Sequence, residues 1–366
     1  MKIERIEAIP YTIPYARPLK FASGEVTTAD HVLIRIHTDT GIMGVADAPP
    51  RPYTYGETQD SIVSVVTKVF APQLIGLDPL DRSKVQQILR RTIHNPTAKG
   101  ALDIALWDII GISLDTPVHK LLGGFTDGMR VSHMLGFKPA AQLLDEALQF
   151  RGTYGINTFK LKTGRRPLSL DVEACQVLRD GLGADTEIYL DANRGWTANE
   201  AMEVLRRTEG LGLSMLEEPC EAGEAMGRRR LVQHSSIPIV GDESVSTLGD
   251  VSRELLSGGS SGICIKTARS GFTEAQQILG LCEGLGVDVT MGNQIDTQVG
   301  SLATVTFGAA FEASSRRAGE LSNFLDMTDD LLAEPLEIRD GSIYVRDVPG
   351  VGARIEADKL QKYRQD

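Results

Sequence analysis

Thr158-Phe-Lys-Leu-Lys162 is the first of five short apolar segments that carry charged residues at their ends. The other four are Ile188-Tyr-Leu-Asp191, Met215-Leu-Glu217, Ile237-Pro-Ile-Val-Gly-Asp242 and Ile263-Cys-Ile-Lys266. From Lys162 onward, the charged ends are 29, 26, 25 and 24 residues apart. Such steps fit one strand, one helix and two loops, which is the repeating unit of a (β/α) barrel. Because barrel active sites collect at the carboxyl ends of the strands, the spacing predicts both the fold and a charged site.

The length and composition of the chain are those of a folded protein with two domains. Its 366 residues exceed one average domain and suit a barrel plus a second unit. Hydrophobic residues make up 42% and charged residues 24%, which provides a full core and argues against disorder. The net charge of -11 argues against nucleic acid and anionic membranes as partners, because both attract basic surfaces.

Two further features bear on the compartment. The cysteines at 175, 220, 264 and 282 are widely spaced and form no C-x-x-C pair, so we expect free thiols in a reducing cytosol. The first residues contain no apolar signal region, and no run approaches the roughly 18 apolar residues of a membrane-spanning helix. The sequence therefore predicts a soluble cytoplasmic protein.

The segment 1–125 has the pattern of an α+β domain that precedes the barrel. Alternating or β-branched runs end at turn signals such as Asp39-Thr-Gly41, and longer stretches have apolar residues at helical spacing. The pattern predicts strands over 1–13, 31–38 and 41–48 and helices over 55–91 and 97–112.

The barrel is predicted to occupy 126–325, with strand one over 129–136, strand seven over 288–291 and strand eight over 320–324. The segment 326–366 follows the barrel. Within it, Asp340-Gly341 lies between two strand-like runs of 336–351, which predicts a hairpin. We expect this hairpin to return to the N-terminal domain, because the barrel already has its strands.

Three carboxylates at successive strand ends form the first candidate group: Asp191, Glu217 and Asp242. Mg²⁺ prefers an octahedron of oxygen ligands, and three carboxylates leave about three positions open for water or substrate. Without a cation, converging carboxylates would repel one another and some would bind protons. The alternative is that each acid lies on the surface and pairs with a neighbouring base. Glu218 points to the opposite face of the strand from Glu217 and is not expected to bind a metal.

Three lysines form the second candidate group. Lys160 and Lys162 are two residues apart in a strand, so they share a face at a separation of about 7 Å. Two like charges at that distance repel by about 2–3 kcal/mol at an effective dielectric constant of ~20, which would lower the pKa of a lysine toward neutrality. Lys266 lies four strands further on and would face Lys162 across the barrel mouth. The alternative is that these lysines extend into solvent.

The charged segments resemble the enolase superfamily, in its muconate-lactonizing-enzyme subgroup. The motifs that carry the resemblance are Lys-x-Lys at 160–162, Asp191-Ala-Asn193, Glu217-Glu-Pro219, Gly241-Asp-Glu-Ser244 and Ile265-Lys-Thr267. The resemblance implies an α+β capping domain, formed by the N-terminal segment and the C-terminal tail, over a (β/α)7β barrel of the TIM type. It also implies Mg²⁺, with Mn²⁺ as the alternative ion, on the three carboxylates. Lys162 and Lys266 would be acid/base catalysts, Lys160 an electrostatic auxiliary, and Asn193 a residue behind the metal ligands.

Within the subgroup, the chain is most similar to bacterial, especially actinobacterial, cis,cis-muconate cycloisomerases. The stretches that carry this closer similarity are Phe21-Ala-Ser-Gly24, Ala48-Pro-Pro-Arg-Pro-Tyr53, Met291-Gly-Asn-Gln-Ile-Asp296 and Glu320-Leu-Ser-Asn-Phe324. The similarity implies lactonization of muconate, a small dicarboxylate of aromatic catabolism in the β-ketoadipate pathway. It also implies a homo-oligomer, an octamer by family habit. Loops near 20–30 and 48–58 would close over the substrate.

Within the second of these loops, Arg51 and Tyr53 are candidate substrate-binding residues, and Arg51 would bind the second carboxylate. An exposed, solvated arginine is the alternative.

Two departures from the subgroup pattern bear on specificity. Asp296 occupies a position where many members have Glu, so it could contact the substrate, or it could be a loop acid or a helix cap. Dipeptide epimerases carry Asp-x-Asp on the eighth strand, whereas this chain has Glu320-Leu-Ser322, which disfavours a substrate ammonium. His133, on strand one, points either into the core or into the site.

Several alternatives to the cycloisomerase remain. The same residues could serve an N-acylamino acid racemase, an o-succinylbenzoate synthase or a dipeptide epimerase, and chloromuconates are alternative substrates. Lys266 could instead form a Schiff base, as in a class I aldolase. A binding protein without catalysis would need no pair of proton carriers. The sequence leaves open whether addition is syn or anti and which lysine is the acid.

Overall fold

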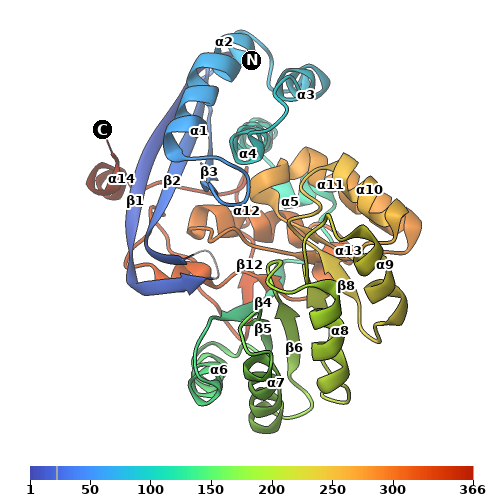
Figure 1. The fold of residues 1–366 in the computed structure, drawn as a ribbon. Helices are drawn as coiled ribbons and strands as arrows, with labels where there is room; N and C mark the ends of the chain where they lie inside the picture. The colour runs from blue at the N-terminus through green and yellow to red at the C-terminus, as the bar shows by residue number, and fades with distance from the viewer. Residues whose placement is uncertain (22–23, 366) are drawn as a thin grey trace.

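The computed structural model describes residues 1–21 and 24–365, and Figure 1 shows its fold. Ala22 and Ser23, which belong to the expected loop near 20–30, lie outside the described residues. The described chain forms a three-stranded N-terminal sheet and a nearly closed barrel of eight strands. This arrangement confirms the predicted fold class.

The N-terminal sheet is antiparallel, with its strands in the order in which they occur in the chain. Its strands are β1 (Ile3–Phe21), β2 (Gly24–Thr38) and β3 (Met43–Ala48). The helices that follow are α1 (Gln59–Val65), the π-helix η1 (Val66–Phe70), α2 (Ala71–Leu74), α3 (Arg82–Leu89), α4 (Pro96–Ser113) and α5 (Val118–Leu122).

The barrel strands pair in parallel in the order β10-β9-β8-β7-β6-β5-β4-β11, and β10 and β11 at the two ends are also in contact. The strands are β4 (Gly128–Leu135), β5 (Thr158–Lys162), β6 (Glu187–Asp191), β7 (Leu216–Glu217), β8 (Ile239–Gly241), β9 (Gly262–Ile265), β10 (Asp288–Met291) and β11 (Gly319–Glu320). Strands one and seven therefore lie within a residue of their predicted positions.

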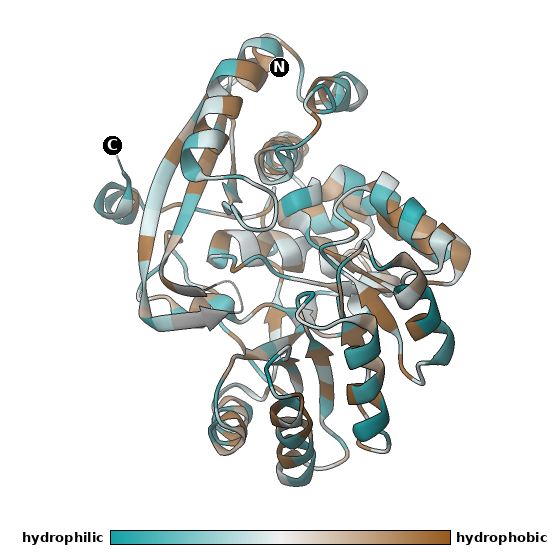
Figure 2. Cartoon of the chain, in the orientation of Figure 1, coloured by the Kyte–Doolittle hydropathy of each residue, from teal (hydrophilic) through white to brown (hydrophobic). Residues whose placement is uncertain are grey.

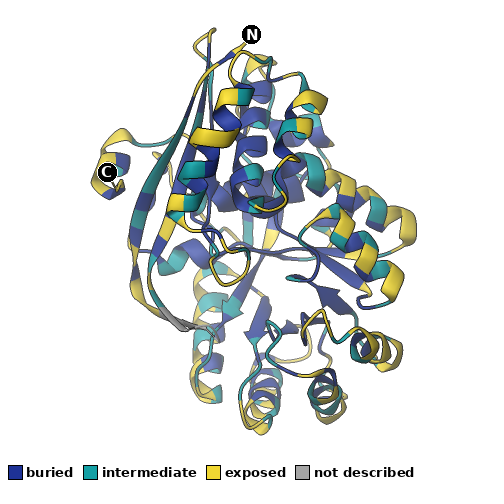
Figure 3. Ribbon diagram, turned by 45° about the horizontal axis from the view of Figure 1, so that its top comes forward, coloured by how far each residue is buried: buried dark blue, intermediate teal, exposed yellow. Residues whose placement is uncertain are grey.

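Helices cover the outside of the barrel. They are α6 (Ala140–Tyr154), α7 (Ser169–Leu182), α8 (Ala198–Arg207), α9 (Ala225–His234), α10 (Leu248–Ser257), α11 (Thr267–Leu285), α12 (Gln298–Gly308) and α13 (Glu312–Ser315). Figure 2 shows apolar residues on the barrel strands and mixed faces on α7 and α8, and Figure 3 shows buried strands under helices with exposed outer faces. The long helix α4 packs against both β3 and α11 and so joins the N-terminal domain to the barrel.

Helix α8 illustrates how the sequence sets these elements. The side chain of Thr197 accepts a hydrogen bond from the backbone of Glu200, and the side chain of Glu200 accepts one from the backbone of Thr197, so the helix begins with a capping box. Ala198, Ala201 and Val204 recur at helical spacing and are buried against the barrel. The same box recurs at the start of α10.

The strand register places the charged residues at one level. Lys162 pairs with Asp191 across β5 and β6, and Asp191 pairs with Glu217 across β6 and β7. Asp242 and Lys266 directly follow the ends of β8 and β9. The parallel register thus converts the regular spacing in the sequence into one ring of charges at the carboxyl end of the barrel.

Two expectations for the C-terminal part are corrected. The eighth strand covers only residues 319 and 320, because the chain then bends into the 3-10 helix η2 (Asn323–Asp326). The tail hairpin turns at Asp340 and Gly341, but its strand β12 (Ser342–Tyr344) pairs with the start of β4 and not with the N-terminal domain. The start of β4 precedes the part that pairs with β5 and β11, so its backbone groups are free to bind β12. The last helix, α14 (Ala357–Tyr363), does contact β1.

All four cysteines are free and buried, as expected. Among the described helices, none combines the length and the apolar composition needed to cross a lipid bilayer.

Candidate active site

A cavity of about 860 Å³ lies between the carboxyl end of the barrel and the N-terminal domain. Its barrel side includes Lys160, Lys162 and Lys266. Its other side is formed by residues 26–31 of the sheet and by the loop 50–60. The predicted lysines and the predicted capping loop therefore line one cavity.

The three predicted metal ligands lie together at the carboxyl end of the barrel, and of these Asp242 lines the cavity. Asp191, Glu217 and Asp242 are at most 1% exposed. Asp191 accepts hydrogen bonds from the ammonium groups of Lys160, at 2.8 Å, and Lys162, at 2.5 Å. Glu217 accepts one from Lys160 at 2.9 Å. Lys160 therefore bridges two of the carboxylates in the interior. Lys162 lies two residues further along β5, on the same face of the strand, and also reaches the cavity.

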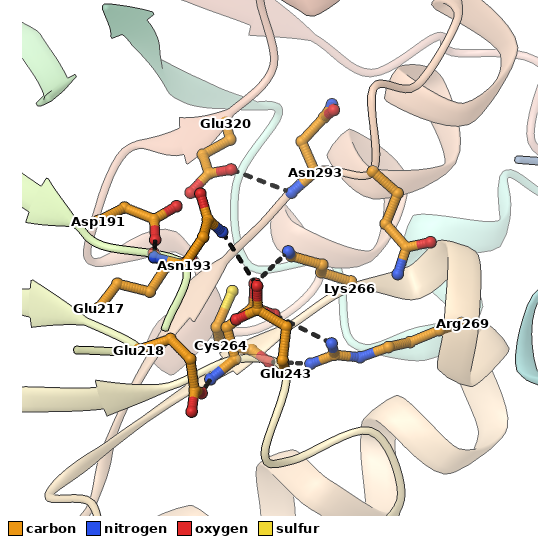
Figure 4. Close-up of polar contacts among 12 residues, drawn as sticks. Asp191, Asn193, Glu217, Glu218, Glu243, Cys264, Lys266, Arg269, Asn293 and Glu320 are labelled. Atoms are coloured by element: carbon orange, nitrogen blue, oxygen red, sulfur yellow. Dashed lines mark hydrogen bonds and ion pairs between the residues drawn. The ribbon is translucent and has the colours of Figure 1, made fainter. Parts of the chain in front are cut away.

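Asp242 is held from the opposite side. Lys266 donates to its Oδ2, and Arg269 donates to its Oδ1 at 2.9 Å. Figure 4 shows Lys266 and Arg269 approaching from α11 and the preceding strand, opposite Asp191 and Glu217. A lysine therefore lies on each side of the carboxylates, as the sequence predicted.

The charges set the protonation of this group. Burial raises the pKa of Asp191, but Lys160 and Lys162 outweigh burial and hold the pKa below its usual range. Asp242 behaves similarly, with Lys266 and Arg269 lowering its pKa to about 2 against the effect of burial. Burial, together with the repulsion of the neighbouring carboxylates, raises the pKa of Glu217 well above its usual value.

The lowering of the lysine pKa that was expected from the Lys160–Lys162 pair is wrong for Lys160. Burial lowers the pKa of Lys160 and of Lys266, but the adjacent carboxylates outweigh burial and raise both values well above the usual one. The sequence estimate counted the repulsion between neighbouring lysines but not these carboxylates.

The donor atoms fit a hard divalent cation. The Oε2 atom of Glu217 is buried and has no hydrogen-bond partner among the described residues. Ligand atoms of Glu217, Asp242 and Cys264 lie within 4.8 Å of one another. Burial and the nearby carboxylates raise the pKa of the Cys264 thiol well above its usual value, so it stays protonated and is a poor ligand. Oxygen ligands are those that Mg²⁺ prefers, so the carboxylates are the better donor set.

Two further residues complete the network of charges, and the sequence did not single out either role. Glu320 lines the cavity, whereas Arg269 does not. Glu320 on β11 accepts hydrogen bonds from Lys160 at 2.5 Å and from the backbone of Asn293 at 3.3 Å. Arg269 follows Lys266 by three residues, so the first turn of α11 brings both cations to Asp242. The sequence could have indicated both residues, because Glu320 ends one barrel strand and Arg269 closely follows another.

Asn193 lines the cavity, accepts a hydrogen bond from Lys162 at 2.6 Å and donates one to Glu243 at 3.0 Å. Its role behind the metal ligands stays a prediction. Burial, with the adjacent carboxylates, raises the pKa of Glu243 to about 7. Glu218 is turned away from the other carboxylates and pairs with the buried Arg228 at 2.8 Å.

The predicted substrate-binding residues are not equivalent. Arg51 lines the cavity, and its Nη2 atom is buried with no hydrogen-bond partner among the described residues. Tyr53 also lines the cavity but is 78% exposed, so it lies at the rim. Asp296 is 1% exposed and does not line the cavity; it lies behind Ile295, which does. His133 stacks on Phe150 at 3.6 Å and belongs to the core.

Comparisons with known proteins agree with this geometry. The family profile described as "Mandelate racemase / muconate lactonizing enzyme, N-terminal domain" matches residues 5–123, and that described as "Enolase C-terminal domain-like" matches residues 142–359. The crystal structure of a muconate lactonizing enzyme from Mycobacterium smegmatis, complexed with muconolactone, is 54% identical with a TM-score of 0.98, and the match covers 100% of both chains.

Relatives with other activities are similar as well. An L-Ala-D/L-Glu epimerase from Bacillus subtilis is 30% identical over 320 residues, which cover 86% of each chain. Muconate cycloisomerase 1 from Rhodococcus opacus is 26% identical over 371 residues, which cover 100% of this chain and 99% of the relative. Both domains and the whole length are therefore accounted for, and the chain belongs to the enolase superfamily of enzymes, in the group of mandelate racemase and muconate lactonizing enzyme.

Proposed function

We propose that this enzyme is a Mg²⁺-dependent muconate cycloisomerase that converts cis,cis-muconate into muconolactone. The observation that carries the proposal is the 54% identity, over the whole chain, to a muconate lactonizing enzyme whose structure contains muconolactone. The cavity supports it, because its lining includes lysines next to the buried carboxylates and an arginine whose Nη2 atom has no hydrogen-bond partner among the described residues.

Asp191, Glu217 and Asp242 would hold the Mg²⁺ ion. When bound, the ion supplies positive charge beside the substrate carboxylate on which negative charge develops during the reaction. Lys160 is 1% exposed, and its ammonium group is bound by Asp191, Glu217 and Glu320. Its contribution is a fixed positive charge that holds the ligands in place and offsets their repulsion.

The reaction needs one proton at one carbon. A carboxylate oxygen at one end of muconate bonds to the fourth carbon of the chain, and the electron pair of the adjacent double bond moves to the fifth carbon. That carbon takes a proton from a lysine, so the dianion becomes a monoanionic lactone. Lys162 and Lys266 lie on opposite sides of the carboxylates, and the side from which the proton comes decides whether addition is syn or anti.

Arg51 suits the second carboxylate of a dicarboxylate. It lies on the capping side of the cavity, and its Nη2 atom has no hydrogen-bond partner among the described residues. A guanidinium group matches the two oxygens of a carboxylate, so an anionic group of the substrate would satisfy this donor.

An epimerase or racemase is the second candidate, because relatives with those activities are 30% and 26% identical. Two opposed lysines could remove and return an α-proton equally well. A dipeptide, however, brings an ammonium group that needs a free carboxylate. Glu320 is bonded to Lys160, and Ser322 is bonded to His133, so this strand end offers no free carboxylate.

The test is the loss of muconate ultraviolet absorbance on mixing with the purified protein and Mg²⁺ in D2O, with an EDTA control. The proposal requires EDTA-sensitive loss and one deuterium in the lactone. Absence of any loss would overturn it. Exchange of the α-proton of an N-acylamino acid or a dipeptide would then identify the second candidate.

A further inference from the structure

A histidine on the capping side of the cavity is held by a buried carboxylate. His31, on β2, lines the cavity and is 2% exposed. Its Nδ1 atom lies 2.7 Å from Oδ2 of Asp47, on the neighbouring strand β3. The Nε2 atom has no hydrogen-bond partner among the described residues. One ring nitrogen is therefore fixed by the protein, while the other is free for a ligand.

Asp47 is held in place by hydrogen bonds from both domains. Its side chain is fully buried and accepts hydrogen bonds from the hydroxyls of Tyr11, at 2.9 Å, and Thr297, at 2.8 Å. Tyr11 and Thr297 come from the capping sheet and the barrel, so both domains fix the carboxylate. A carboxylate bonded to Nδ1 sets the orientation of the ring and the tautomer that leaves Nε2 facing the ligand.

Basic and acidic groups both surround the pair. Arg51 and His31 are the basic residues that line this side of the cavity, and Asp30 and Asp60 are the acidic ones. Asp47 and Asp296 do not line the cavity but interact with His31 and Arg51. Burial, with the nearby Asp47, raises the pKa of Asp296 to about 6, so this carboxyl holds its charge less readily than an exposed one. Asp330 faces Asp47 and Tyr11 from the far side and does not line the cavity.

At the opposite end of the cavity, the basic side chains are already paired with carboxylates. There, Lys162 and Lys266 are already bonded to Asp191 and Asp242. The cavity thus has a carboxylate-rich floor that suits a cation and a capping wall where two basic side chains have free donor positions. A molecule with a carboxylate at each end matches both.

We propose that His31, oriented by Asp47, donates a hydrogen bond from Nε2 to the second carboxylate of the substrate and, with Arg51, selects dicarboxylates over monocarboxylates. This inference rests on the proposed function, because it assigns the substrate end that lies away from the lysines. His31 is then a specificity-determining residue, and Asp47 is its positioning residue.

The chain offers a matched control. His37 lies on the same strand, and its Nε2 atom lies 2.7 Å from Oε2 of Glu7, so it is also a histidine paired with a carboxylate. It does not line the cavity, however. Replacing His37 tests for any effect of losing a paired histidine from this sheet without touching the cavity.

Adipate and hexanoate are suitable probes, because each has six carbons and they differ only in the second carboxylate. Their dissociation constants are measured by calorimetry in the presence of Mg²⁺ for the wild type, His31→Gln, Asp47→Asn and His37→Gln. We expect the wild type to bind adipate about tenfold or more tightly than hexanoate, as a charged hydrogen bond would give. His31→Gln should bind adipate about tenfold more weakly than the wild type and bind hexanoate with an unchanged dissociation constant. Asp47→Asn should weaken adipate binding by a smaller factor, and His37→Gln should leave both dissociation constants unchanged.

An equal adipate preference in the wild type and His31→Gln would overturn the inference, as would a wild type that does not distinguish the two acids. Because neither acid is turned over, this result is independent of whether the enzyme lactonizes muconate. If the variants do not fold, the wild-type protein can be tested by NMR. Among the six histidines, the ring ¹⁵N signals of His31 should shift on addition of adipate but not of hexanoate. Unchanged His31 signals would overturn the inference.

Discussion

The Nη1 atom of Arg269 lies 2.9 Å from the hydroxyl oxygen of Tyr55, and the same nitrogen lies 2.9 Å from Oδ1 of Asp242. Tyr55 belongs to the capping loop and also accepts a hydrogen bond from Gln294 at 2.7 Å. A single hydroxyl therefore links the capping domain to a proposed metal ligand and to the loop after β10.

Tyr55→Phe should lower kcat/KM for muconate by about ten- to a hundredfold and the melting temperature by only a few degrees. The variant removes a hydrogen bond to a charged group, which contributes about 1.5–3 kcal/mol, but leaves the packing of the ring in place. Steady-state kinetics and thermal melts measure both quantities. Tyr344→Phe, in which the tyrosine is 49% exposed and far from the cavity, is the control. Unchanged kcat/KM in Tyr55→Phe would show that the link has no role in catalysis.

Lys160→Met should destabilise the protein, and Mg²⁺ should restore part of the loss. Lys160 bonds to Asp191, Glu217 and Glu320 in the interior, and removing one member of such a buried group costs about 3–5 kcal/mol. A bound cation would offset the same negative charges, so the decrease in melting temperature should be larger in EDTA than in Mg²⁺. Lys84→Met, which breaks an exposed pair with Asp81, should change little in either condition. An equal decrease with and without Mg²⁺ would contradict the proposed site.

Glu146→Gln should remove a contribution to stability that depends on pH. His133 and Lys138 hold the pKa of Glu146 at about 2, against the effect of burial, whereas its ordinary value is 4.5. Because the folded-state pKa is the lower one, the stabilisation is present above about pH 4.5 and is lost as the pH falls toward about 2. The difference between the two pKa values corresponds to about 3 kcal/mol.

Urea unfolding of the wild type and Glu146→Gln at pH 7, 5 and 4 checks this dependence. The gap in unfolding free energy should be widest at pH 7 and should begin to narrow below pH 5. Glu312→Gln, at an exposed pair with Arg316, serves as the control. A gap that is constant across this range would show that the ionised form of Glu146 is not what stabilises the fold.

The sequence predicted the barrel and its ring of charges because both follow from local patterns. Each strand is a short apolar run, and each charge directly follows or ends one, so parallel pairing brings Lys162, Asp191 and Glu217 to one level. No long-range contact has to be known for that inference. Glu218 was excluded as a ligand by the alternation of side chains in a strand, and its pairing with Arg228 agrees with that exclusion.

Contacts between distant residues could not be predicted in the same way. Glu320 bonds to Lys160 across 160 positions of sequence, and this carboxylate helps to reverse the expected direction of the lysine pKa. The tail hairpin joined β4 because the start of that strand has free backbone groups, which no local pattern indicates. The pair of His31 and Asp47 depends on the register of β2 and β3 and on Thr297 from the barrel.

Replacing the two cavity lysines separately should identify the proton donor. In at least one of Lys162→Ala and Lys266→Ala, kcat for muconate should fall by about 10²–10⁴, because a positioned general acid contributes that much. Both lysines bond to proposed metal ligands, so Mg²⁺ affinity must be measured by calorimetry in each variant to separate loss of the acid from loss of the ion. The position of the single deuterium in lactone made by the wild type in D2O gives the side of protonation, and it should match the lysine whose loss is more severe. Full activity in both variants, with Mg²⁺ binding intact, would rule out lysine as the acid and with it the proposed mechanism.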